Sequence, residues 1–153
     1  MKVVTLNIAG IQNLAKRKLL VDYLTSNDFD IVCLQEVSFH QCELIEKHFQ
    51  FISNIGPRKR GTAVLLRQGL RASRILLEPE GRLISVDLPG LTVVCIYAPS
   101  GCVYRRERNT FFQNTIPAYV LTSKLPVVVS GDFNDIDDLA QSTTRASRKI
   151  SST

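Results

Sequence analysis

Residues 126–134 read Pro-Val-Val-Val-Ser-Gly-Asp-Phe-Asn, and this stretch decides the fold class. Three consecutive valines after a proline predict a short strand that is buried on both faces. Two polar side chains, Asp132 and Asn134, follow this strand at once. Apolar strands that end in polar loops are typical of layered α/β domains, in which the loops at the strand ends carry the functional groups.

Similar apolar runs recur toward the N-terminus and alternate with amphipathic segments. Strands are predicted over residues 3–8, 31–34, 62–66, 71–77, 82–88 and 91–97, with a brief one at 51–52. Helices are predicted over residues 16–24, 40–49 and 105–121, the last disturbed at Pro117 because proline cannot donate a helical hydrogen bond. The turn dipeptide Pro89-Gly90 predicts a hairpin between the two strands around it. The fold class is therefore α/β (α+β).

Length and composition restrict the kind of protein this is. The chain has 153 residues, 44% of them hydrophobic and 22% charged, which indicates one globular domain and excludes a wholly disordered chain. No apolar run approaches the roughly 20 residues that a membrane helix needs, and the N-terminus lacks a signal-peptide pattern. We expect an intracellular protein without a membrane segment. The four cysteines form no C-x-x-C pair, which argues against a disulfide framework or a structural zinc site.

The composition changes near the C-terminus. Residues 136–153 are rich in serine, threonine and arginine and show almost no apolar periodicity. We predict a folded domain over residues 1–135 and a disordered tail over residues 136–153.

The side chains at the predicted strand ends form a set that could carry chemistry: Asn7, Glu36, Tyr97, Asp132 and Asn134. Each has an ordinary structural explanation, as a turn former, a helix cap, a core aromatic or a turn carboxylate. Together they supply two carboxylates, two amides and a phenol, and Mg²⁺ needs only one or two carboxylates beside water and substrate oxygens. The set therefore predicts metal-assisted attack on a phosphodiester.

Basic side chains indicate a polyanionic partner. The net charge is +5, which fits DNA binding and is equally common in basic proteins that bind no nucleic acid. The loop with Arg58, Lys59 and Arg60 and the helix start with Arg105 and Arg106 are candidate phosphate contacts, with solvated basic surface as the alternative. His40, Cys42 and His48 are predicted on one solvated helix at a spacing that does not suit zinc.

Five short motifs stand in order along the chain: Leu6-Asn7-Ile8, Leu34-Gln35-Glu36, Gly81-Arg82, Tyr97-Ala98-Pro99 and Ser130-Gly131-Asp132-Phe133-Asn134. In this order they resemble the endonuclease/exonuclease/phosphatase (DNase I-like) superfamily. The segment from Ile96 to Phe112 looks most like the endonuclease domain of non-LTR (LINE-type) retrotransposons. The resemblance covers about residues 1 to 135.

The resemblance implies a four-layer αββα sandwich with a hydrolytic site at one rim. It implies Mg²⁺, with Mn²⁺ as an alternative, held chiefly by Glu36 with the help of Asn7. By the same resemblance Tyr97 would support the phosphate, Asp132 would orient or activate the attacking water, and Asn134 would contact the scissile phosphate. The implied activity is DNA nicking in the nucleus or cytoplasm, with a reverse transcriptase region as a partner in the parent polyprotein. Arg82 would bond acceptors between the sheets.

The chain departs from the family pattern at its C-terminal end. The family has a late Asp-His motif on a further strand, whereas the two histidines here, His40 and His48, both precede Asp132. We therefore expect a C-terminally truncated domain with an unpaired sheet edge. Two alternatives to an active nuclease follow: an inactive or nucleic-acid-binding fragment, and a phosphoinositide-type phosphatase of the same superfamily. Ala9 stands where repair-type members have Asp, which counts against a dedicated repair role.

Overall fold

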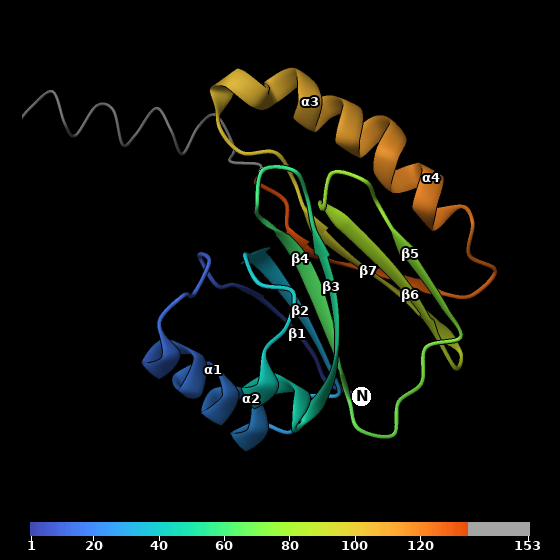
Figure 1. Cartoon of the computed structure of the whole chain (residues 1–153). Helices are drawn as coiled ribbons and strands as arrows, with labels where there is room; N and C mark the ends of the chain where they lie inside the picture. Colours follow the sequence, from blue (N-terminus) through green and yellow to red (C-terminus); the bar gives the residue numbers. More distant parts are fainter. Residues whose placement is uncertain (135–153) are drawn as a thin grey trace, which may run out of the picture.

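The computed structural model describes residues 1–134, which form four layers (Figure 1). Two four-stranded sheets pack face to face, with helices on both outer sides. The strands are β1 (Val3–Asn7), β2 (Ile31–Val37), β3 (Phe49–Ile55), β4 (Gly61–Arg67), β5 (Arg74–Leu77), β6 (Leu83–Leu88), β7 (Leu91–Tyr97) and β8 (Val127–Asp132). The helices are α1 (Leu14–Ser26), α2 (Glu43–Glu46), α3 (Arg105–Thr110) and α4 (Ile116–Val120). The predicted αββα sandwich is confirmed.

Each sheet combines one parallel pair with antiparallel strands. The first sheet has the order β1-β2-β4-β3 and the second the order β5-β6-β7-β8. Strand β1 runs parallel to β2, and β7 runs parallel to β8. The predicted hairpin at Pro89-Gly90 is present, with Leu88 opposite Leu91 in an antiparallel pair. Because parallel strands end at the same side of a sheet, the ends of β1 and β2 meet, as do those of β7 and β8.

Side-chain alternation along β2 divides the core into layers. Val32 and Leu34 pack toward the layer of α1, and Ile31 and Cys33 pack toward the second sheet; all four are fully buried. This explains why the run is continuously apolar rather than alternating, since both faces of the strand are covered. The inner core therefore fixes one sheet upon the other and holds the strand ends of both at a common rim.

The outer helices cover the sheets with apolar side chains. In the first outer layer Leu20 and Leu24 of α1 are buried against the sheet. On the other side a π-helical stretch, Phe111–Thr115, separates α3 from α4 and buries Phe111 against the second sheet. This irregular stretch ends two residues before Pro117, as the predicted disturbance implies, because proline leaves a carbonyl of the previous turn without its helical donor.

The prediction of a helix over residues 40–49 is wrong in the length of the helix. Only Glu43–Glu46 is helical, and Phe49 already begins β3, where it is buried and pairs with Arg67 of β4. Seven consecutive cross-strand pairs to β4 outweigh the weak helical periodicity of this segment. His40 and His48 therefore lie on either side of a single helical turn and share no helix.

Two edge strands position the candidate site. Within residues 1–134, β1 and β8 are each at one edge of their sheet, and side chains at their ends are hydrogen-bonded to each other. The predicted tail over residues 136–153 lies outside the described residues. No helix within residues 1–134 has the length and apolar character needed to cross a bilayer.

Asp87 provides a test of how the second sheet is held together. Its carboxylate accepts hydrogen bonds from Arg74 Nε and Thr92 Oγ1, both at 2.7 Å, and so ties β5 and β7 to β6. The bond from Arg74, followed by that from Thr92, lowers the pKa of Asp87 below its ordinary value of 3.8. A lowered folded-state pKa contributes stability above pH 3.8, and this contribution is lost as the pH falls through the folded-state pKa.

We expect Asp87→Asn to lower the free energy of unfolding by about 1 kcal/mol at pH 7. The difference in free energy of unfolding between variant and wild type should shrink below pH 3.8, because only the wild type has a carboxylate at residue 87 that becomes protonated there. Urea unfolding at a series of pH values measures it. Asp22→Asn, on exposed helix surface, is the matched control and should leave stability almost unchanged. A difference that stays constant down to strongly acid pH would contradict the expectation.

Candidate active site

Strand ends from both sheets converge on one side-chain amide, that of Asn7. Its Nδ2 donates to Glu36 Oε1 at 3.0 Å and to Asp132 Oδ2 at 2.9 Å. Its Oδ1 accepts from the backbone N–H of Ala9 at 3.0 Å, which fixes the orientation of the amide. Asn7 and Glu36 come from the first sheet and Asp132 comes from the second, so the three predicted side chains form one cluster across the sandwich.

Glu36 lies at an irregularity of β2. Gln35 pairs with Thr62 and Val37 pairs with Gly61, so Glu36 between them has no partner on β4. Its φ is +56°, a left-handed conformation that costs a non-glycine residue about 1–3 kcal/mol. Such bulges redirect a side chain at a strand end. Here the bulge releases the Glu36 carboxylate from the buried pattern of β2 and places it at the rim.

Asp132 is held through both of its carboxylate oxygens. Oδ2 accepts from Asn7, and Oδ1 accepts from the backbone N–H of Asn134 at 3.0 Å. Asn134 has a φ of +46°, and its Nδ2 donates to the carbonyl of Ala98 at 2.8 Å. The loop after β8 is thereby bonded to the loop after β7. One amide hydrogen of Asn134 is used in this bond, and no other residue among 1–134 accepts the second.

Tyr97 lies directly opposite Asp132 in the parallel pair of β7 and β8. Burial raises the pKa of its phenol above 10.0, as does the charge of Glu36, while the charges of Arg82 and Arg60 oppose the rise. The phenol therefore stays protonated near neutral pH and can donate a hydrogen bond. Arg82 Nη1 donates to the Tyr97 carbonyl at 3.1 Å, and its guanidinium lies 5.1 Å from the ring centroid. The expectation that Arg82 bonds acceptors between the sheets is therefore corrected, because its bonds lie within the second sheet.

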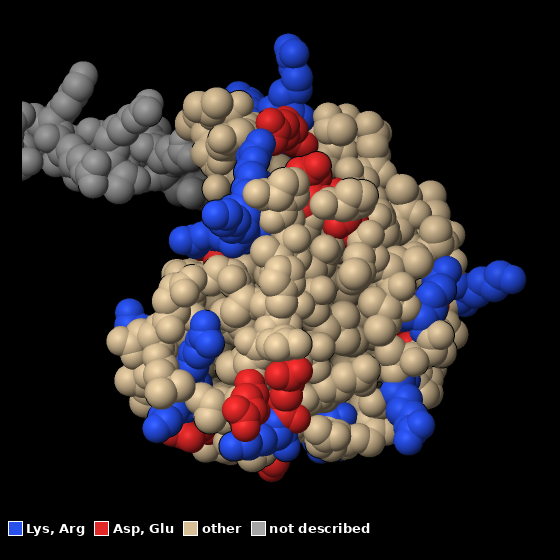
Figure 2. Space-filling view, viewed as in Figure 1, with Lys and Arg blue, Asp and Glu red and all other residues tan. Residues whose placement is uncertain are grey.

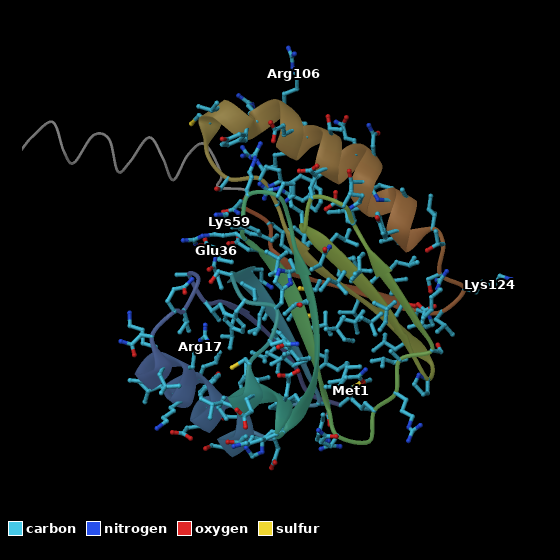
Figure 3. All side chains as sticks on the ribbon, viewed as in Figure 1. Met1, Arg17, Glu36, Lys59, Arg106 and Lys124 are labelled. Atoms are coloured by element: carbon cyan, nitrogen blue, oxygen red, sulfur yellow. The ribbon has the colours of Figure 1, made fainter. Side chains whose placement is uncertain are left out.

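The predicted basic residues divide into two groups. Arg60 pairs with Glu36 inside the cluster, whereas Arg58 pairs with Glu107 of α3 at 3.8 Å and lies over the ring of Tyr104. In Figure 3 Arg106 points outward from α3. Arg58 and Arg106 line a separate cavity of about 480 Å³, which lies between the β3–β4 loop, the β5–β6 turn and α3. Arg105 is exposed on α3. Figure 2 shows basic side chains interspersed with acidic ones near α3, so this face is not one continuous basic surface.

The oxygen donors of the cluster suit a hard divalent cation. Two carboxylates are within hydrogen-bond reach of one nitrogen, which brings Glu36 and Asp132 close together. Mg²⁺ is commonly bound through one or two carboxylates, with the remaining positions filled by water and phosphate. Residues 1–134 contain no group of three or more His, Cys, Asp or Glu side chains arranged to hold a metal, and His40, Cys42 and His48 form no such group. The cluster therefore fits Mg²⁺ better than zinc.

Two contacts of the cluster are not visible in the sequence. The pair between Arg60 and Glu36 depends on the register of β2 against β4, since Gly61 opposite Val37 places Arg60 next to the bulge. The bonds from Arg82 to Tyr97 depend likewise on the β6–β7 pairing. The sequence offers one indication of each contact, the glycine next to each arginine. Gly61 and Gly81 lie where the backbone of another segment comes too close for a side chain.

Known proteins resemble this chain in sequence and in fold. A family model described as "Endonuclease/Exonuclease/phosphatase family" matches residues 4–152. An exodeoxyribonuclease of Bacillus subtilis is 26% identical over 149 residues, which cover 88% of this chain and 58% of that protein. The chain thus spans little more than half the length of this curated relative.

Solved structures show the same fold. TDP2 from C. elegans superposes with a TM-score of 0.68 at 18% identity, covering 88% of this chain and 48% of that one. Humanized D. rerio TDP2 superposes with a TM-score of 0.69 at 20% identity, covering 92% of this chain and 65% of that one. With the αββα sandwich and the family match over nearly the whole chain, this protein belongs to the endonuclease/exonuclease/phosphatase family, whose members are typically metal-dependent phosphodiesterases and nucleases.

Proposed function

We propose that this chain hydrolyses phosphodiester bonds in DNA with Mg²⁺, as an endonuclease that nicks duplex DNA. The observation that carries the proposal is the convergence of Glu36 and Asp132, from opposite sheets, on the amide of Asn7. A structural role for each residue alone would not require carboxylates of two sheets to meet at a half-exposed rim.

Glu36 and Asn7 are the residues that would hold the metal ion. Glu36 would offer its carboxylate oxygens and Asn7 its amide oxygen or a bond to a coordinated water. A bound Mg²⁺, or Mn²⁺ in its place, supplies charge stabilisation at the phosphoryl oxygens. The Asn7 amide also keeps the two carboxylates in a fixed relation, because one Nδ2 donates to both.

The remaining residues act on water and phosphate. Asp132 is oriented through both oxygens and retains lone pairs that can accept a proton from the attacking water. Tyr97 stays protonated and can donate to a phosphoryl oxygen, and the second amide hydrogen of Asn134 can do the same. These donors lie next to Asp132, so water and phosphate would meet between the ends of β7 and β8.

DNA is the substrate that charge and relatives favour. The net charge is +5, and Arg58, Lys59 and Arg60 follow one another in the loop that borders Glu36. The B. subtilis relative is named an exodeoxyribonuclease. The narrower form of the proposal, nicking of the retrotransposon type beside a reverse transcriptase region, is supported by the sequence from Ile96 to Phe112. An intracellular location, nuclear or cytoplasmic, accords with a DNA substrate.

A second candidate function is DNA binding without turnover. It is favoured by the position of both histidines before Asp132 in the sequence. His48 immediately precedes Phe49, which pairs with Arg67 at the end of β4 remote from Gly61 and Glu36. This histidine is therefore not part of the cluster and cannot assist Asp132.

Nicking of supercoiled plasmid by the 153-residue chain in Mg²⁺ tests the proposal. We expect Asp132→Asn to reduce the rate about 10²-fold or more, the range that general acid–base groups contribute, with DNA affinity largely retained. Asp22→Asn is the matched control and should nick like the wild type. If the wild type binds DNA but nicks no faster than Asp132→Asn, the enzyme proposal fails and the binding candidate is supported. If the wild type neither binds nor nicks, both fail.

A further inference from the structure

We propose that Arg60 competes with the divalent cation for Glu36, and that the released guanidinium binds the phosphate of the substrate. This inference rests on the proposed function, because it assumes that Glu36 holds the metal. Arg60 Nη1 donates to Glu36 Oε2, while the other carboxylate oxygen, Oε1, accepts from Asn7. The guanidinium thus occupies one of the two carboxylate oxygens that Glu36 would offer to a metal ion.

The β3–β4 loop places Arg60 there by backbone contacts. The Arg60 carbonyl accepts from the N–H of Gly56 at 3.2 Å, and the Lys59 N–H donates to the Gly56 carbonyl at 3.0 Å. Arg60 immediately precedes Gly61, the β4 residue opposite Val37 at the bulge. The loop is therefore closed on itself by backbone hydrogen bonds, directly before the strand residue that lies beside the bulge.

The Arg60 guanidinium lies close to Gly10. A Cβ at Gly10 would be 3.4 Å from Arg60 Cζ and 3.5 Å from Nη2. The Arg60 side chain nevertheless remains 48% exposed, against 23% for Glu36. A half-exposed guanidinium with one charged partner can leave it without unpairing a buried group. The pair is consequently exchangeable rather than a fixed structural element.

Competition follows from the shared oxygen. A guanidinium and a metal ion cannot both occupy the same lone pairs of Oε2, so the ion pair lowers the apparent metal affinity. Exposed ion pairs of this kind change an equilibrium by about two- to five-fold. A planar guanidinium with several donors matches phosphate better than a point charge does.

The two roles predict effects of opposite sign when Arg60 is neutralised. In Arg60→Gln we expect Mn²⁺ to bind about two- to five-fold more tightly, because Glu36 loses its resident cation. We expect the affinity for a duplex oligonucleotide in Ca²⁺ to fall about ten-fold, because a charged phosphate contact is lost. A purely structural role for Arg60 would weaken both kinds of binding together.

The experiment measures Mn²⁺ binding by calorimetry and duplex binding by fluorescence anisotropy, on the full 153-residue chain. Lys59→Gln is the matched control, because it removes the same charge from the same loop and Lys59 forms no ion pair with any residue of the described part. The gain in Mn²⁺ affinity should also vanish when Arg60→Gln is combined with Glu36→Gln, since the two residues then share no interaction to lose.

The outcomes separate this inference from the proposed function. Equal changes in Mn²⁺ affinity in Arg60→Gln and Lys59→Gln would overturn the inference, because net charge alone would explain them. A loss of Mn²⁺ affinity in Arg60→Gln would overturn it as well. If instead Glu36→Gln binds Mn²⁺ as tightly as the wild type, the metal site of the proposed function fails, whatever Arg60 does.

Discussion

Glu36→Gln is expected to reduce the rate of phosphodiester cleavage about 10³-fold or more. A bound metal ion supplies several kcal/mol of transition-state stabilisation, and each 1.4 kcal/mol corresponds to about ten-fold in rate. Glutamine has the size of glutamate and can still accept from Asn7 Nδ2, so the cluster should keep its shape. The substitution removes the negative charge that a hard cation requires, and with it the ion pair to Arg60. We therefore expect the loss in activity to be accompanied by a loss of Mn²⁺ affinity of at least about ten-fold.

Plasmid nicking and Mn²⁺ calorimetry on the same preparations measure this result. Glu43→Gln on α2 is the matched control, because it makes the same chemical change at a side chain that is 89% exposed. Its activity, Mn²⁺ affinity and Tm should equal those of the wild type. A Glu36→Gln protein that melts normally, binds Mn²⁺ normally and cleaves normally would remove Glu36 from the site altogether.

Gly131→Ala is expected to destabilise the fold by about 3 kcal/mol or more. A Cβ at Gly131 would be 2.0 Å from the carbonyl oxygen of Ile96 and 2.8 Å from its carbonyl carbon. Both atoms belong to the backbone of the neighbouring strand β7, so no side chain can turn away to make room. The φ of Gly131 is +150°, a region that other residues avoid. Overpacking and backbone strain each cost about 1–3 kcal/mol, and here they act together.

Gly90→Ala separates the cost of backbone strain from the cost of overpacking. Gly90 has a φ of +78° but no atom lies within 4 Å of a Cβ placed there. This variant should therefore show only backbone strain, about 1 kcal/mol. Thermal unfolding compares the two, and Gly131→Ala should lower Tm by about 10 °C. Equal losses of Tm in the two variants would show that Ile96 does not restrict residue 131.

A second effect of Gly131→Ala bears on the site. Asp132 directly follows Gly131, and its carboxylate is held between Asn7 and Asn134 at bond lengths of 2.9 and 3.0 Å. Moving β8 away from β7 would shift Asp132 relative to Asn7, which belongs to the other sheet. Cleavage by Gly131→Ala should therefore fall even below its Tm, because small misplacements of a catalytic group cost about 10²-fold in rate.

Much of the fold could be predicted because its signals are local. The valines of residues 127–129, the run from Ile31 to Leu34 and the turn at Pro89-Gly90 each specify their element within a few residues. The prediction failed at residues 40–49, where a weak helical pattern competed with pairing to β4. That pairing partner begins at Gly61, so no local window contains the deciding contact.

The sequence by itself determined the α/β class and the set of polar residues at the strand ends, and the order of its five motifs carried the resemblance that implied the αββα sandwich and the family. These depend on side-chain periodicity and on motif order, and both are properties of the chain read in one dimension. The tertiary structure alone decided that one amide of Asn7 bonds carboxylates of both sheets, and that Glu36 leaves its strand at a bulge and is paired with Arg60. The physical reason is that these contacts join residues separated by 29, 125 and 24 positions. Their distances are set by how the two sheets pack and by the register of β2 on β4, which no local pattern specifies.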